Sequence, residues 1–167
     1  MARKNLTITL YMSELIYDFQ NKAYITGISR RAGGTDAEAA SKMQASDDEE
    51  DVNQALRSIQ GAYGQLLVEL SEGLSSGEEN TSTNELIDGE ENIEIHLSLP
   101  SNYNLGLKDA LTSNIHDYII NKSLMDWFTI TNPNEAKTYE DMAVTALKGI
   151  HETFNRRERP SRKSVNE

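Results

Sequence analysis

The amino-acid sequence predicts a mainly α-helical fold: a bundle of three to four helices with a C-terminal helical hairpin and a small β element of one or two short strands. Apolar residues recur at three- and four-residue steps through several long segments, and only two short stretches alternate apolar with polar residues. The 167 residues suit one domain. A hydrophobic content of 37% and an aromatic content of 7% are low, so we expect neighbouring subunits to help bury apolar surface.

The first two elements are predicted to be a strand and a helix. Leu6, Ile8 and Leu10 alternate with polar residues, as in a short half-buried strand. From residue 13 the period becomes helical, and Gly27 marks the expected end of this helix. The apolar face of the helix consists of Met12, Leu15, Ile16, Phe19 and Ala23. Residues 29–47 lack a sustained apolar face and are expected to form a mobile insertion that could contain a helical turn at 37–43.

A second helix follows the acidic run Asp47–Asp51, whose negative charge favours a helix N-terminus. The run does not match a calcium-binding EF-hand loop. Val52 stands at the loop position that needs glycine, and Ser58 stands at the position that needs glutamate. The apolar residues of the helix keep a three- and four-residue step over several turns. They are Val52, Ala55, Leu56, Ile59, Ala62, Tyr63, Leu66, Leu67 and Leu70.

A second mobile insertion is expected at 71–92, which is rich in Ser, Gly and Glu. Next come four apolar residues that alternate with polar ones and indicate a strand closed by Pro100. These residues are Ile93, Ile95, Leu97 and Leu99. Because a lone strand needs a partner, we expect it to pair with Leu6–Leu10 or with an equivalent strand of another subunit.

The C-terminal part predicts an antiparallel helical hairpin. A long helix begins near Leu107 and ends with Trp127 and Phe128; a polar turn follows, and Pro133 suits the first turn of the next helix. Both helices carry an apolar face, and the two aromatic residues are expected to wedge the corner between them. The hairpin core is predicted to contain Tyr118, Trp127, Phe128, Tyr139 and Phe154.

Motifs for catalysis, metals and nucleotides are weak in this sequence. "GLSSG" around Ser75 matches a nucleophile elbow in letters, but it follows a predicted helix instead of a strand. His96, His116 and His151 have no second histidine at a metal-binding spacing, so we interpret them as solvated or hydrogen-bonded. With no cysteine, no phosphate-binding loop and no nucleophile–base pair, we expect no enzyme activity, no cofactor and no metal. No secretory signal or membrane segment is expected either.

A basic arm, residues 156–167, closes a chain whose formal net charge is -11, after a helical domain at 1–155. Such an arm is typical of segments that dock on a partner, whereas attraction to DNA would be opposed by the overall charge. The alternative is that the basic residues only complement the dipole of the last helix and that the end is disordered. The basic residues are Arg156, Arg157, Arg159, Arg162 and Lys163.

The stretch from Ser113 to Pro160 resembles the C-terminal helical hairpin of head-to-tail connector proteins, the adaptor or ring proteins beneath the portal of tailed bacteriophages. The matching features are Trp127-Phe128, "TNPNEAKTYEDM" and "NRRERP". "LIYDFQNKAYITGISRR" and "DEEDVNQALRSI" are similar to proteins from phages of gut Bacteroidales, including the crAss-like group. The insertion at 71–100 departs from the simplest all-helical adaptors.

The resemblance implies a structural virion protein of the neck, assembled in the cytoplasm of a bacterial host. It implies a closed ring, commonly twelve-fold, that docks on the portal through the arm, contacts other neck or tail ring proteins, and lets DNA pass as non-specific cargo. The strand of Ile93, Ile95, Leu97 and Leu99 could then join neighbouring subunits. A small helical protein-binding module or regulator is the alternative, and a tail-completion or capsid-decorating protein also fits.

Overall fold

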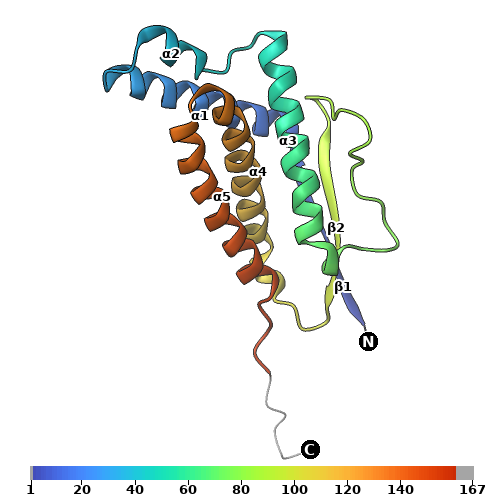
Figure 1. Cartoon of the computed structure of the whole chain (residues 1–167). Coiled ribbons are helices and arrows are strands. Elements are labelled where there is room, and N and C mark those ends of the chain that lie inside the picture. The colour runs from blue at the N-terminus through green and yellow to red at the C-terminus, as the bar shows by residue number, and fades with distance from the viewer. Residues whose placement is uncertain (1, 161–167) are drawn as a thin grey trace, which may run out of the picture.

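A computed structural model describes residues 2–160 of the chain (Figure 1). The described part is mainly helical, with five α-helices, four of them long, and a two-stranded antiparallel sheet, which confirms the predicted fold class. The elements are β1 (Arg3–Tyr11), α1 (Met12–Ala32), α2 (Ala37–Lys42), α3 (Glu49–Glu69), the 3-10 helix η1 (Ser71–Gly73), β2 (Asn92–Pro100), the 3-10 helix η2 (Leu105–Leu107), α4 (Lys108–Thr131) and α5 (Pro133–Phe154).

Three long helices, α3, α4 and α5, lie side by side, and α1 crosses them at one end with α2 beside it (Figure 1). The sheet lies against this bundle. β1 pairs with β2 with Leu6 opposite Leu97 and Ile8 opposite Ile95, so the first of the two expected pairings is confirmed. The apolar face of the sheet joins the helices in one hydrophobic core, and the polar face is turned outward.

Helix α1 continues to Ala32. The prediction that this helix ends at Gly27 is therefore wrong. A Cβ at Gly27 would lie 2.9 Å from the carbonyl oxygen of Ala40 and 2.5 Å from Cγ of Gln44. Glycine therefore lets α2 approach α1 closely and does not terminate the helix. The chain turns instead at Gly33 and at Gly34, whose φ of 97° is in the left-handed region.

The segment expected as the first insertion is partly helical and packs on the core. Asp36 caps α2 by accepting hydrogen bonds from the backbone N–H groups of Glu38 and Ala39. Ala40 and Met43 are buried, and the Met43 carbonyl accepts a hydrogen bond of 2.9 Å from Nε1 of Trp127. These contacts place α2 over the end of α4.

The C-terminal hairpin is present as predicted, although its aromatic residues divide their contacts. Phe128 and Tyr139 stack across α4 and α5 with ring centroids 5.1 Å apart. Trp127 does not wedge the corner but meets Phe19 of α1 edge-on, with centroids 5.8 Å apart. Phe154 is half-buried and packs on Gly73, where an added Cβ would overlap the ring.

Candidate functional site

The root of the basic arm is attached to the folded domain just after α5. The Asn102 carbonyl accepts a hydrogen bond of 2.7 Å from the backbone N–H of Glu158, and Tyr103 forms an antiparallel bridge with Arg157. The Glu158 carboxylate lies 2.6 Å from Nζ of Lys4, at the start of β1. The loop before η2 and the first strand therefore fix the position from which the arm leaves the molecule.

Three arginines of the arm lie in the described residues, and all three are exposed: Arg156, Arg157 and Arg159. Within residues 2–160, none of them lies within ion-pair distance of a carboxylate. Arg157 uses one Nη1 donor to cap the end of α5 at the Phe154 carbonyl, 3.0 Å away. Arg157 thus complements the C-terminal dipole of α5, and among residues 2–160 most guanidinium donors of the three arginines have no hydrogen-bond partner. Arg162 and Lys163 lie outside the described residues.

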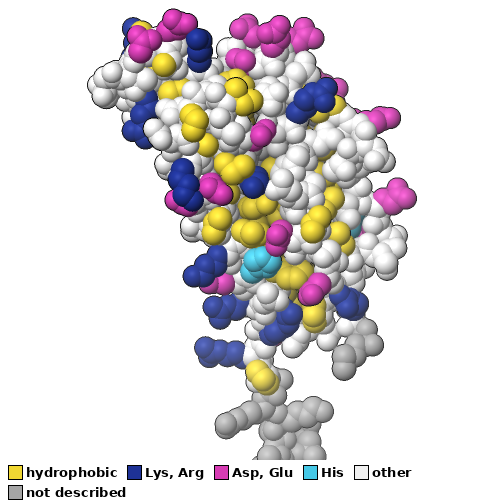
Figure 2. Space-filling model, in the orientation of Figure 1, with side chains coloured by type: hydrophobic (Ala, Val, Ile, Leu, Met, Phe, Trp, Pro, Cys, Tyr) yellow, Lys and Arg dark blue, Asp and Glu magenta, His cyan; other side chains and the backbone are white. Residues whose placement is uncertain are grey.

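Charge is distributed unevenly along the molecule. The acidic residues Glu49, Glu50 and Asp51 occupy the first turn of α3, at the end opposite to the arm. Figure 2 shows Asp and Glu side chains together with several Lys and Arg side chains at that end, whereas Lys and Arg side chains predominate near the end of α5. The acidic run serves a helix N-terminus as predicted, and Asp51 also accepts hydrogen bonds from the N–H and hydroxyl of Ser46. The acidic pole is defined by Glu49, Glu50 and Asp51 at the start of α3, and the basic pole by Arg156, Arg157 and Arg159 after α5.

The predicted inter-subunit strand is part of the chain's own core. Ile93, Ile95, Leu97 and Leu99 are all at most 1% exposed. Both edges of β2 are occupied within the chain, because β1 covers one edge and residues 74–81 cover the other, with Ser75 N–H donating to His96 O over 2.8 Å. Pairing with a strand of another subunit would have to use the outer edge of β1.

That outer edge of β1 is open. In antiparallel pairs, alternate residues direct their backbone groups away from the partner strand. On β2 these residues include Glu94 and His96, which bond to residues 74–81, so their partners Thr9 and Thr7 direct N–H and C=O outward. Within the described chain, no hydrogen bond reaches the outward backbone groups of Thr7 or Thr9. The sequence predicted the strand of Ile93, Ile95, Leu97 and Leu99 as the inter-subunit strand, whereas the fold leaves the free edge on β1.

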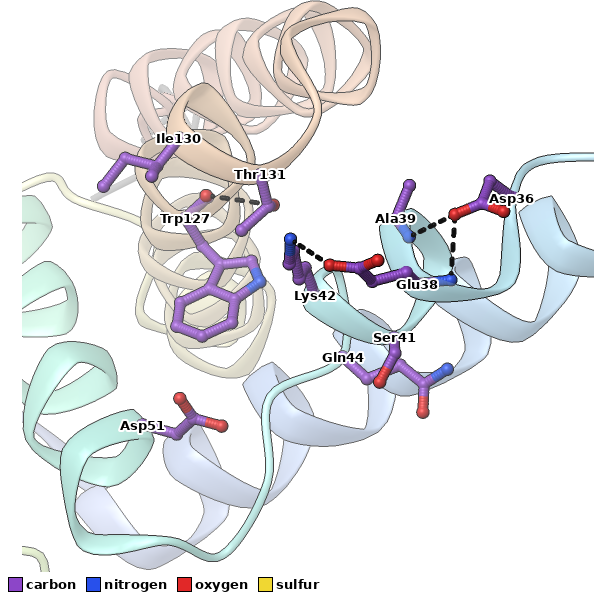
Figure 3. A pocket seen from close by; sticks show the side chains of 10 residues that line it. All are labelled: Asp36, Glu38, Ala39, Ser41, Lys42, Gln44, Asp51, Trp127, Ile130 and Thr131. Carbon is purple, nitrogen blue, oxygen red and sulfur yellow. Dashed lines mark hydrogen bonds and ion pairs between the residues drawn. The ribbon is translucent and has the colours of Figure 1, made fainter.

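A recess of about 730 Å³ lies between α2, the start of α3 and the end of α4 (Figure 3). Its wall consists of Asp36, Glu38, Ala39, Ser41, Lys42, Gln44, Asp51, Trp127, Ile130 and Thr131. The charged groups already have local partners, since Asp36 caps α2, Asp51 binds Ser46, and Glu38 lies 2.8 Å from Lys42. The three carboxylates of the recess therefore all take part in local contacts of the fold.

The candidate catalytic residues do not come together. Ser75 follows the 3-10 helix η1 and not a strand, and its Oγ accepts only a long 3.4 Å bond from the N–H of Gly77 in the described part. Each histidine lies beside a carboxylate, with His116 2.7 Å from Asp18 and His151 3.3 Å from Glu69. His96 lies 3.2 Å from Glu78. These contacts link separate elements, which agrees with the hydrogen-bonded interpretation. Absence of enzyme activity stays a prediction.

Residues 2–160 contain no group of three or more acidic or histidine side chains placed to hold a metal ion. No helix among them combines the length and the apolar character needed to cross a bilayer.

Comparison of the chain with family models, with curated proteins and with solved structures found no significant match. The functional interpretation therefore depends on the surfaces described above.

Proposed function

We propose that the chain is a structural subunit of the head-to-tail connector of a tailed bacteriophage, where copies form a closed ring that docks on the portal. The supporting observation is the arm. Its root is held by backbone contacts to residues 102–104, and its exposed arginines have no carboxylate partner in the described residues. Guanidinium groups presented in this way suit the bidentate recognition of carboxylates on an acidic partner surface.

The two poles give the proposed ring a direction. The basic pole carries the arm and would face the portal, while acidic residues elsewhere would border the channel. With a net charge of -11 per chain, a ring of copies repels DNA phosphates, so the genome passes without adhering. DNA is then cargo and not a ligand.

Imaging tests this function. The purified chain, with and without its portal, is examined by negative-stain microscopy and by mass measurement. We expect rings in the sample that contains the portal, where they seat on it. A chain that ends at Asn155 should fail to seat, although that truncation also removes the Glu158–Lys4 contact at the root.

A sharper variant keeps the backbone of the root and removes the three charges, together with the Arg157 hydrogen bond to the Phe154 carbonyl. Replacing Arg156, Arg157 and Arg159 together with Gln leaves the backbone root in place and should weaken portal binding about tenfold or more. The matched control replaces Arg57, Lys122 and Lys137 with Gln, which alters net charge equally but away from the arm. Equal weakening by both variants would show that general charge, and not the arm, binds the portal.

The second candidate is a small helical protein-binding module or regulator. Large apolar side chains exposed on α1, including Tyr17 at 67% and Ile25 at 56%, favour it because they need a partner. Stoichiometry separates the two functions. A regulator stays a monomer or dimer with its target, whereas a connector subunit joins a ring once the portal is supplied.

A further inference from the structure

Helix α1 carries a second stripe of residues on the face opposite its buried one. Alternating steps of three and four residues along one helix face generate a seam of the kind that packs against another helix. The stripe consists of Glu14, Tyr17, Asn21, Tyr24, Ile28 and Arg31. All six are exposed, and within the described residues none of their side chains forms a hydrogen bond or an ion pair.

This stripe is self-complementary when two copies run antiparallel. Pairing about a two-fold axis between Asn21 and Tyr24 puts Glu14 against Arg31 of the second copy and Tyr17 against Ile28 of the second copy. Acidic and basic ends therefore meet at both limits of the seam, with apolar residues between them. A parallel arrangement would instead place Glu14 beside Glu14 and Arg31 beside Arg31, so charge selects the antiparallel one.

We propose that free copies of this protein pair through the α1 stripe as an antiparallel two-fold dimer before they assemble. The pair covers apolar side chains that would otherwise face water, such as Tyr17, Tyr24 at 49% and Ile28 at 43% exposure. A two-fold contact opposes the two chains, so a ring of one polarity cannot contain it. If the chain is the proposed connector subunit, the dimer holds unassembled copies apart from the ring. The pairing itself follows from the α1 stripe alone, and its test needs no portal.

A charge swap tests the pairing. Glu14→Arg alone and Arg31→Glu alone should each weaken the dimer about tenfold, because two attractive contacts become repulsive. The combined variant carries both changes and should return to within about threefold of the natural chain, since the pairs re-form with reversed signs. Glu50→Arg, in the first turn of α3, is the matched control for lost helix-dipole charge and should leave the dimer unchanged.

Cysteine cross-linking tests the direction, and the natural chain has no cysteine to interfere. Residues 17 and 28 lie about 16 Å apart along a helix, at 1.5 Å per residue, which is too far for a disulfide between two copies of the same position. A mixture of Tyr17→Cys and Ile28→Cys chains should therefore cross-link across the two variants, and Tyr17→Cys alone should not.

Mass measurement by light scattering over a concentration series, on the purified chain without portal, provides the readout. A dimer whose affinity falls in the single variants and returns in the combined one supports the proposal. A monomer at every concentration, a ring as the smallest species, no recovery in the combined variant, or efficient cross-linking of Tyr17→Cys alone would each overturn it.

Discussion

Helices α1 and α5 have nearly equal lengths, 21 and 22 residues, but use their apolar residues differently. The apolar stripe of α5 packs against α4 in the hairpin. The two exposed apolar residues of α5, Met142 and Val144, lie on different sides of the helix. In α1 one stripe enters the core and a second faces solvent. Burial inside the chain therefore explains α5 almost completely and α1 only in part. The exposed apolar residues of α1 are therefore the part of the helix that the fold itself does not explain.

The largest expected effect lies in the hairpin. Phe128 is fully buried and stacks on Tyr139, so Phe128→Ala should lower the free energy of unfolding by about 3–5 kcal/mol. Chemical denaturation followed by circular dichroism measures it. A loss below about 1 kcal/mol would mean that the hairpin is not packed as the structure has it.

Gly27 lies on the buried face of α1, where the helix packs closely against α2. Ala is the better helix former, yet Gly27→Ala should destabilise the fold by about 1–3 kcal/mol, because its Cβ would press on the backbone of α2. Gly64→Ala in α3 is the control, since its Cβ would meet open space and should stabilise the helix slightly. Thermal unfolding of both variants distinguishes a packing glycine from a tolerated one.

The tyrosines extend the comparison to pH. Burial raises the pKa of Tyr63 to about 12 from 10.0, and its hydroxyl donates to the Thr81 carbonyl over 2.9 Å. The fold favours the neutral phenol, so this contribution to stability is complete below pH 10.0 and is lost as the pH rises toward about 12. Phenolate absorbance should show that Tyr63 ionises late, and unfolding measured against pH should show the matching loss of stability. The Tyr63→Phe variant should lack both effects. Ionisation of Tyr63 in the folded protein at its ordinary pKa would contradict the burial.

The smallest effect on stability is expected on the exposed face of α1. Replacing Tyr17 and Tyr24 with Ser should change the free energy of unfolding by less than about 1 kcal/mol, because both side chains are exposed. The same variant should alter the mass of the particles in solution. A large loss of stability without any change in association would show that the stripe supports the fold itself.

The helices and strands could be predicted because local periodicity determines them. The apolar stripes of α3 and α5, the alternation in β2 and Pro133 at the start of α5 are all readable in short windows of sequence. Gly27 was misread because glycine serves both helix ends and close packing. The packing of α2 was missed because Ala40 and Met43 are too sparse to form a pattern.

The residues of the basic arm could be predicted from the sequence, but the position of the arm on the folded domain could not. The arginines of the arm are visible as a cluster, but the contacts that fix its root join residues far apart in sequence, such as Lys4 and Glu158. Sequence alone also could not show that the chain itself buries the apolar face of the predicted inter-subunit strand, which consists of Ile93, Ile95, Leu97 and Leu99. Alternation indicates a strand with one buried face but does not indicate which chain covers that face or which edge stays free.

Binding of the chain to its portal as a function of salt concentration tests the role of the arm. The natural chain should lose affinity steeply as salt rises, because arginine–carboxylate contacts are screened, and the Arg156→Gln, Arg157→Gln, Arg159→Gln variant should bind weakly with a shallow dependence. If the variant binds as tightly as the natural chain and with the same salt dependence, the basic pole is not the docking surface.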